Sequence, residues 1–188
     1  AGDIGGTHAR IALFEKGSKS VEKKFPSQKY PGLEQIIDEF LAEHPSKVKS
    51  ACFGIAGPIR NGKCKATNLP WIVDAMHLQK HLGIAKVTLL NDLEANAHGL
   101  GVLKEDEFFV LQKGDPSQKG NRGLISAGTG LGEAGLFWDG KKHHPFACEG
   151  GHCDFAVRDE TEIALFSYLH KQFGHVSYER VVSGPGLH

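Results

Sequence analysis

The chain has 188 residues, of which 40% are hydrophobic, so it can form one ordinary domain or two small ones around a real core. Lys and Arg total 22 and Asp and Glu total 22, so the chain has no basic excess to attract nucleic acid or a membrane surface. Its apolar runs are too short for a bilayer span and no signal-peptide pattern opens the sequence, so we expect neither nucleic acid nor membrane among its partners.

The first half of the chain alternates predicted strands and helices, which favours a sheet with helices packed against it. Strands are expected at residues 11–15, 51–55 and 87–90. A helix opens at Pro31-Gly32, and a second covers residues 73–82 and ends at Gly83. The first helix carries one apolar stripe, formed by Leu33, Ile36, Ile37, Phe40 and Leu41.

After Gly101 the pattern changes to strands joined by short turns. Strands are expected at residues 108–111, 123–126 and 133–138, with a hairpin turn at Asp139-Gly140. Asp159 and Glu162 form a helix start, and Gly174 ends that helix, whose apolar stripe is Ile163, Phe166, Leu169 and Phe173. We therefore predict two domains, a small α/β domain at residues 1–103 and a second at residues 104–188.

The dipeptide Asn91-Asp92 directly follows the predicted strand at residues 87–90. A carboxylate at such a strand end can face a cleft and take a proton from a substrate hydroxyl, although Asn-Asp can also be only a turn or a helix start. Glycine turns precede and follow it, and their backbone N–H groups can approach an anion. These turns are Gly2-Asp3-Ile4-Gly5-Gly6-Thr7 and Gly128-Thr129-Gly130-Leu131-Gly132.

A base between two phosphate-type turns indicates phosphoryl transfer to an alcohol. The first turn matches neither the P-loop pattern nor the dinucleotide-binding pattern, so generic motifs alone carry little weight. A strand, a glycine turn and a strand occur at residues 2–14 and again at residues 123–138. Two such hairpins in two domains could face each other across a cleft.

Seven blocks in a fixed order make the chain resemble the bacterial glucokinase family over its whole length. The resemblance implies an actin-like ATPase (ribonuclease H-like) α/β fold, ATP-dependent phosphorylation of glucose in the cytoplasm, and a homodimer. The blocks are Gly2-Asp3-Ile4-Gly5-Gly6-Thr7-His8-Ala9-Arg10, Gly54-Ile55-Ala56-Gly57-Pro58-Ile59, Thr67-Asn68-Leu69-Pro70-Trp71, Leu90-Asn91-Asp92, Ala127-Gly128-Thr129-Gly130-Leu131-Gly132, Glu149-Gly150-Gly151-His152-Cys153-Asp154-Phe155 and Glu179-Arg180-Val181-Val182-Ser183-Gly184-Pro185-Gly186-Leu187.

The resemblance also implies a role for each matching residue. Asp92 is the expected general base, and Asp3 is expected to hold Mg²⁺ through water, unless it only caps backbone N–H groups. The expected ATP phosphate ligands are Gly2, Asp3, Ile4, Gly5, Gly6, Thr7, Gly128 and Thr129. The expected glucose ligands are Asn68, Asn91, Asp92, Gly130, Glu149, His152 and Glu179. Without the resemblance, Glu179 would be interpreted as a solvated helix carboxylate beside Arg180.

Residues 143–154 combine histidines, cysteines and acids, so a zinc site is an alternative. A related repressor–kinase group places zinc beside a similar Gly-His, but its C-x-C-G-x-x-G-C pattern is missing here. We therefore expect no zinc and interpret His152 as a sugar ligand. The four cysteines are scattered, as is typical of a reducing cytosol, and Cys52 is expected to be buried; they are Cys52, Cys64, Cys148 and Cys153.

Three hypotheses therefore stand: a sugar kinase for glucose or a related hexose, a sugar-sensing regulator of the same fold without catalysis, and a small zinc-stabilised module. A pure sensor has no need of a base at Asp92, which favours the kinase. The chain opens at Ala1-Gly2, its only methionine is Met76, and it ends in a turn sequence. We expect it to be truncated at both ends, and to bind ATP weakly by itself because the family's adenosine-binding segment lies beyond residue 188.

Overall fold

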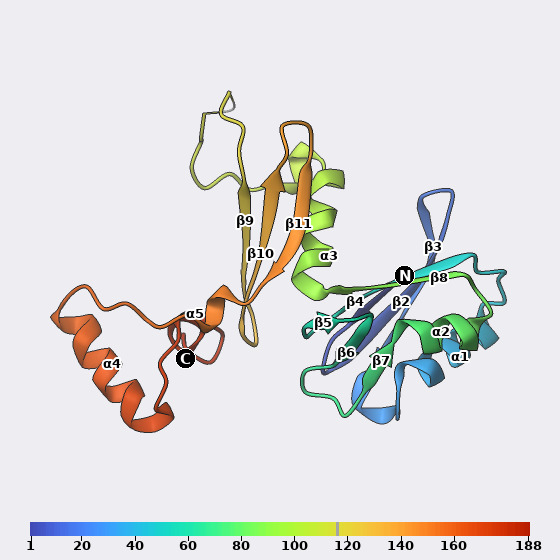
Figure 1. The fold of residues 1–188 in the computed structure, drawn as a ribbon, viewed down its shortest axis with the longest axis horizontal. Helices are drawn as coiled ribbons and strands as arrows, with labels where there is room; N and C mark the ends of the chain where they lie inside the picture. The colour runs from blue at the N-terminus through green and yellow to red at the C-terminus, as the bar shows by residue number, and fades with distance from the viewer. Residues whose placement is uncertain (116) are drawn as a thin grey trace. The chain divides into compact units, whose positions relative to one another are not determined.

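A computed structural model describes residues 1–115 and 117–188 of the chain (Figure 1). The chain divides into two compact units, Ala1–Asn96 and Ala97–His188. The division falls inside helix α3 (Asp92–Gly99). The boundary between residues 103 and 104 that the sequence suggested stays a prediction.

The first unit is built on a five-stranded sheet in the order β3-β2-β1-β4-β8. Strands β1, β4 and β8 run parallel to one another, whereas β2 and β3 are antiparallel to their neighbours. These strands are β1 (Gly2–Ile4), β2 (His8–Glu15), β3 (Ser18–Pro26), β4 (Ser50–Ile55) and β8 (Lys86–Asn91).

The three parallel strands end at the same level of the sheet. Ile4 is paired with Ile55, and Ile55 is paired with Asn91. In open α/β sheets, ligands bind at the edge formed by the carboxyl ends of the strands. The segments that follow Ile4, Ile55 and Asn91 therefore lie at an edge suited to a ligand.

One hydrophobic core holds the first unit together. Helix α1 (Leu33–Glu43) buries the stripe expected from its spacing, with Leu33, Ile36, Ile37 and Phe40 all inside. Helix α2 (Ala75–Leu82) adds Leu78 to the same cluster. A small sheet closes it, formed by β5 (Ile59–Arg60), β6 (Lys63–Lys65) and β7 (Ile72–Asp74).

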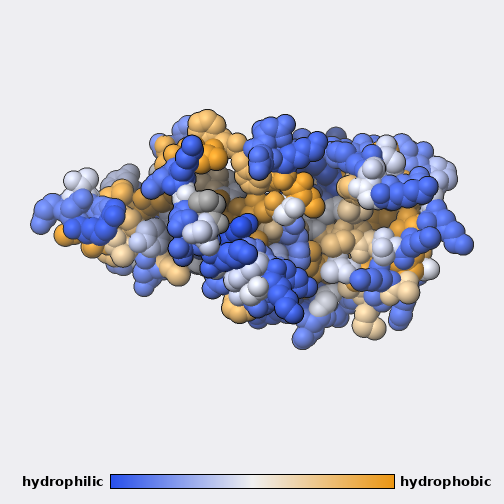
Figure 2. Space-filling model, turned by 90° about the horizontal axis from the view of Figure 1, so that it is seen from above, coloured by the Kyte–Doolittle hydropathy of each residue, from blue (hydrophilic) through white to orange (hydrophobic). Residues whose placement is uncertain are grey.

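The second unit contains a three-stranded antiparallel sheet in the order β11-β10-β9. Few of its apolar side chains are buried; Ile125, Phe137 and Phe146 of the sheet and Ile163 of helix α4 are all exposed. Hydrophobic groups at the surface appear orange in Figure 2. Its elements are η2 (Leu100–Val102), η3 (Glu105–Glu107), β9 (Arg122–Ala127), β10 (Leu131–Trp138), β11 (His143–Cys148), η4 (Gly150–His152), α4 (Glu160–Phe173) and α5 (Tyr178–Val182).

Most of the elements predicted from the sequence are confirmed. The strands at residues 51–55, 87–90, 123–126 and 133–138 correspond to β4, β8, β9 and β10. The Asp159 carboxylate accepts the N–H of Glu162 at 2.8 Å and starts α4. Both expected hairpins with glycine turns also form, because β1 pairs antiparallel with β2 and β9 with β10. Within the described ranges, no helix is long and apolar enough to cross a membrane.

Four sequence expectations are wrong. Residues 108–111 form no strand, because their apolar side chains find no partner and are exposed. Residues 73 and 74 belong to β7, since Asp74 caps α2 and the helix begins at Ala75. The first glycine turn, expected at residues 2–7, is shorter, because Gly2–Ile4 form strand β1. Cys52 is only half-buried, because it faces the side of β4 opposite the buried Phe53.

Two glycine-to-alanine substitutions should have opposite effects on stability. Gly83 ends α2 with φ +64°, whereas Gly99 has a right-handed helical backbone with φ −67° and open space around it. We expect Gly83→Ala to lower the free energy of unfolding by about 1 kcal/mol and Gly99→Ala to leave it unchanged or raise it. Denaturant unfolding followed by circular dichroism checks both, and a loss of stability at Gly99 alone would contradict the assignment.

Candidate active site

Asp92 is the first residue of α3 and directly follows β8. Its side chain is half-buried at the sheet edge where β1, β4 and β8 end. Burial raises the pKa of the Asp92 carboxyl, and the nearby negative charge of Asp3 raises it further, while the Leu93 N–H bonded to Oδ1 opposes this shift. A carboxylate with a raised pKa is a stronger base than an exposed aspartate, as proton removal requires.

Asn91, the last residue of β8, holds the start of helix α3, which carries Asp92. Its side chain is buried, and its Oδ1 accepts the N–H groups of Leu93 at 3.0 Å and Glu94 at 3.2 Å. Its Nδ2 donates to the Gly57 carbonyl at 3.3 Å. Asn91 thus caps α3 and ties it to the segment after β4, and one of its amide N–H groups is left without a partner among these bonds.

Asp3 lies within strand β1, and β4 separates this strand from β8. It is paired with Gly54 of β4, and a side-chain carbon at Gly54 would lie 3.8 Å from the Asp92 Cα atom. The Asp3 carboxylate accepts a hydrogen bond from Arg10 of β2 at 2.9 Å, and both side chains are exposed. An exposed ion pair of this kind is weak, so the carboxylate can exchange Arg10 for a cation.

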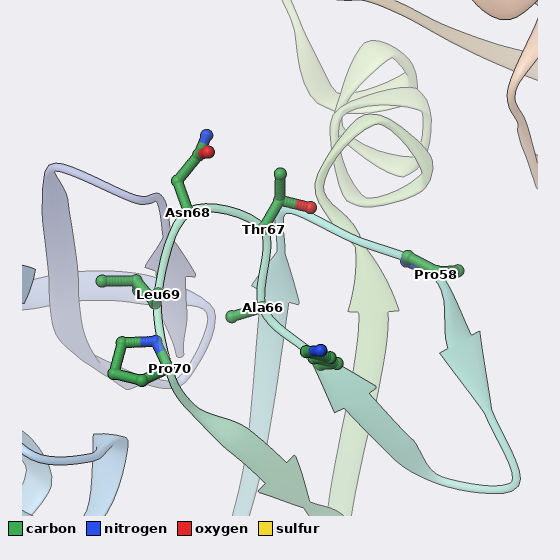
Figure 3. A pocket seen from close by; sticks show the side chains of 7 residues that line it. Pro58, Ala66, Thr67, Asn68, Leu69 and Pro70 are labelled. Atoms are coloured by element: carbon green, nitrogen blue, oxygen red, sulfur yellow. The ribbon is translucent and has the colours of Figure 1, made fainter.

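The glycine turn after β1 lies against the segment that carries Asn68. A side-chain carbon at Gly6 would lie 3.0 Å from the Asn68 Cβ atom and 3.3 Å from the Thr67 carbonyl oxygen, so a larger residue would have to push these neighbours aside. Thr67 and Asn68 project from this segment toward the same side (Figure 3). Both residues belong to the lining of a surface cavity. Its lining residues are Pro58, Lys65, Ala66, Thr67, Asn68, Leu69 and Pro70.

In the second unit, the turn between β9 and β10 is held by Glu179 of α5. The Glu179 Oε2 atom accepts the N–H of Leu131 at 2.9 Å, and its carboxylate lies so close to Gly130 that a side chain there would clash. The Gly128 carbonyl accepts the N–H of Gly184 at 2.7 Å. Two contacts from the segment 179–184 therefore fix this second glycine turn.

Glu149 and His152 meet Glu179 beside the same turn. The His152 Nδ1 atom is 4.0 Å from Glu179 Oε1, and its Nε2 atom is 3.9 Å from Glu149 Oε2. His152 ends the short helix η4, so the Glu149-Gly150-Gly151 sequence turns its ring toward the carboxylates. Two carboxylates and an imidazole that converge this way can accept hydrogen bonds from several hydroxyls of one ligand and donate a hydrogen bond to another.

Glu133 is a polar residue of this region that the sequence analysis missed. It lies on β10 with its carboxylate against Gly150, where any side-chain carbon would collide with it, and 3.9 Å from the Cys148 sulfur. A carboxylate so placed supports the backbone that presents Glu149 and His152. Its signal was a single acid between small residues, Gly132-Glu133-Ala134, directly after a glycine turn.

The structure thus forms two groups of the expected residues, one in each unit. The first unit gathers the glycine turn, Asn68, Asn91 and Asp92 with Asp3, and the second gathers the turn at Gly128, Thr129 and Gly130 with Glu149, His152 and Glu179. That both groups serve one sugar and one nucleotide stays a prediction. The Cys148 thiol donates to the Glu133 carboxylate at 3.9 Å. The expected absence of zinc also stays a prediction.

The fold is that of the actin-like ATPases, the class that includes sugar kinases. A crystal structure of glucokinase from an Antarctic psychrotroph superposes with a TM-score of 0.82 at 30% identity, and covers 99% of this chain and 60% of that chain. A hexokinase of the ROK type from Thermus thermophilus has the same fold, with a TM-score of 0.62 at 18% identity over 99% of this chain and 60% of that one. The fold predicted from the sequence is confirmed.

The chain belongs to the glucokinase family, because the family model described as Glucokinase matches residues 1–188. The glucokinase of Trichormus variabilis is 40% identical over 196 residues, which are 100% of this chain and 57% of that protein. The chain therefore spans a little over half the length of this relative.

Proposed function

We propose that the full-length protein transfers the terminal phosphoryl group of ATP to the 6-hydroxyl of glucose in the cytoplasm, with Mg²⁺ as cofactor. Family membership supports the activity, and one observation of the site carries it. The Asp92 carboxylate lies half-buried at a ligand-binding sheet edge, with its pKa raised by burial. Such a group is suited to taking the proton of an attacking hydroxyl.

In this proposal, the two glycine turns bind the ATP phosphates through backbone N–H groups. The proposed ligands are Gly2, Asp3 and Ile4 at the end of β1, Gly5, Gly6 and Thr7 in the turn that follows, and Gly128 and Thr129 in the second turn. Close approach of a phosphate needs a backbone without side chains, which Gly5, Gly6, Gly128 and Gly130 provide in the two turns. Phosphoryl transfer depends chiefly on such positioning and on charge neutralisation.

The residues present also fit Mg²⁺. Asp3 offers an exposed carboxylate at the phosphate turn, and oxygen ligands with several retained waters suit this ion. Asp3 would hold the ion through water, and the ion would neutralise phosphate charge. Asp3 would then leave Arg10, whose ion pair with it is exposed and weak.

Glucose is proposed to lie against Asn68, Asn91, Asp92, Gly130, Glu149, His152 and Glu179. Because a wrong sugar leaves buried polar groups unpaired, several convergent hydrogen-bonding groups discriminate strongly between sugars. Asp92 then accepts the proton of the 6-hydroxyl while the hydroxyl oxygen bonds to the terminal phosphorus of ATP and the bond from that phosphorus to the departing ADP breaks. The resemblance to the family also implies a homodimer, and we include this oligomeric state in the proposal.

A coupled assay of the full-length protein across a panel of hexoses tests this function. We expect glucose to give the highest kcat/KM and a product phosphorylated at the 6-position. A higher kcat/KM for mannose or an amino sugar would assign a related hexose instead. Glucose binding without any sugar phosphate would support the sensor.

A further inference from the structure

Ser27 is a buried hydroxyl outside the residues proposed to bind substrate. It follows β3 as the first residue of η1 (Ser27–Lys29), and its exposed fraction is 0%. Its Oγ donates to the Gly5 carbonyl at 2.8 Å, and its backbone N–H donates to the Thr7 carbonyl at 3.0 Å. One residue therefore holds both sides of the first glycine turn.

The bond to Gly5 has a directional consequence. In a trans peptide, the C=O and N–H groups point in opposite directions. Because the Gly5 carbonyl points toward Ser27, the N–H of Gly6 in the same peptide unit points away from it. In the described part of the chain, no hydrogen bond uses the Gly6 N–H.

The opposite side of this turn is also constrained. Gly6 packs closely against Asn68 and Thr67, and the Gly5 N–H donates to the His8 carbonyl at 2.9 Å. The turn is therefore held at Gly5, Gly6 and Thr7, while the Gly6 N–H remains available. A fixed, unpaired backbone N–H in a glycine turn is a donor for an anion.

We infer that Ser27 is a positioning residue for the first phosphate-binding turn. Its hydroxyl fixes the Gly5–Gly6 peptide plane, so that the Gly6 N–H is aimed at a phosphate of the nucleotide before the nucleotide binds. This inference rests on the proposed function. Without the hydroxyl, the Gly5 carbonyl loses its partner and the peptide plane can rotate. The turn must then become ordered when the phosphate binds, and this ordering lowers the affinity for the nucleotide.

The test is Ser27→Ala in the full-length protein. We expect the KM for ATP to rise roughly three- to tenfold, the range for one lost hydrogen bond, while the KM for glucose and the midpoint of thermal unfolding stay close to wild type. Ser27→Cys replaces the hydroxyl by a slightly larger thiol that is only a weak donor, so its KM for ATP should be intermediate.

Ser20→Ala is the matched control. Ser20 also donates its hydroxyl to a backbone carbonyl, that of Leu13 at 3.1 Å, but it lies in the exposed strand β3 away from the turn. Its KM for ATP should not change. Hydrogen exchange gives an independent readout, since the Gly5 amide should exchange faster in Ser27→Ala than in wild type while amides of the core do not.

An unchanged KM for ATP with unchanged exchange at Gly5 would overturn the inference. An equal rise in both KM values together with a lower unfolding midpoint would show a merely structural role and would also overturn it. If the wild type phosphorylates no sugar, the proposed function fails. Calorimetry with Mg·ATP then still decides the role of Ser27, through weaker binding in the alanine variant or equal binding in both.

Discussion

Asp92→Asn should lower kcat by roughly 10²–10⁴-fold, the usual contribution of a positioned general base. Asparagine keeps the shape of the side chain and an oxygen for the Leu93 N–H that Asp92 accepts at 3.0 Å, so sugar binding should be largely retained. Steady-state kinetics and calorimetry with glucose measure the two effects separately. A kcat equal to that of wild type would show that the proton is removed elsewhere.

The pH dependence of the same variant checks the assignment. Because burial raises the pKa of Asp92, the wild-type kcat should fall as the pH drops through a value above the ordinary aspartate pKa of about 3.9. In Asp92→Asn, kcat should no longer show this fall at low pH. A group with a raised carboxyl pKa loses stabilisation as the pH rises through that pKa, so the variant should be at least as stable as wild type at neutral pH. Asp106→Asn, in the exposed helix η3, is the control and should retain full activity.

Glu179→Ala should weaken glucose binding by roughly tenfold to a hundredfold, as expected for the loss of charged hydrogen bonds. It should also raise the KM for ATP, because the Leu131 N–H loses its acceptor at 2.9 Å and the second glycine turn is released. Glu179→Gln keeps an oxygen for Leu131. It should therefore weaken glucose binding and leave the KM for ATP near that of wild type.

The alanine and glutamine variants together separate the two roles of Glu179. Glu160→Ala, an exposed glutamate in the first turn of α4, is the control for loss of a carboxylate in this unit and should change neither parameter. Equal KM values for ATP in all three variants would show that Glu179 does not hold the turn. Unchanged glucose affinity in Glu179→Ala would remove it from the sugar site.

Local patterns predicted the first unit well because each pattern had one strong physical cause. The stripe from Leu33 to Phe40 has helical spacing and is buried as expected, and Gly83 ends α2 in the left-handed conformation. Strand β3 (Ser18–Pro26) escaped prediction, because as an edge strand rich in lysine it carries little apolar alternation. The apolar run at residues 108–111 misled for the opposite reason, since hydrophobicity alone cannot supply a partner strand.

For the site, sequence order identified candidate residues but not their neighbours. The pairing of Ile4 with Ile55 and of Ile55 with Asn91 brings Asp3 near Asp92 across β4, and no spacing along the chain encodes this register. Ser27 and Glu133 escaped for the same reason, because their roles come from contacts with backbone segments at Gly5 and Gly150 that are distant from them in sequence. Single serines and glutamates are otherwise ordinary surface residues.

The most direct test of the central claim is product formation by the full-length protein with Mg·ATP and glucose, followed by ³¹P nuclear magnetic resonance for wild type and Asp92→Asn side by side. We predict that wild type accumulates glucose 6-phosphate while ATP is converted to ADP, and that the variant forms this product far more slowly although it still binds glucose. Binding of glucose by wild type without any glucose 6-phosphate would contradict the account.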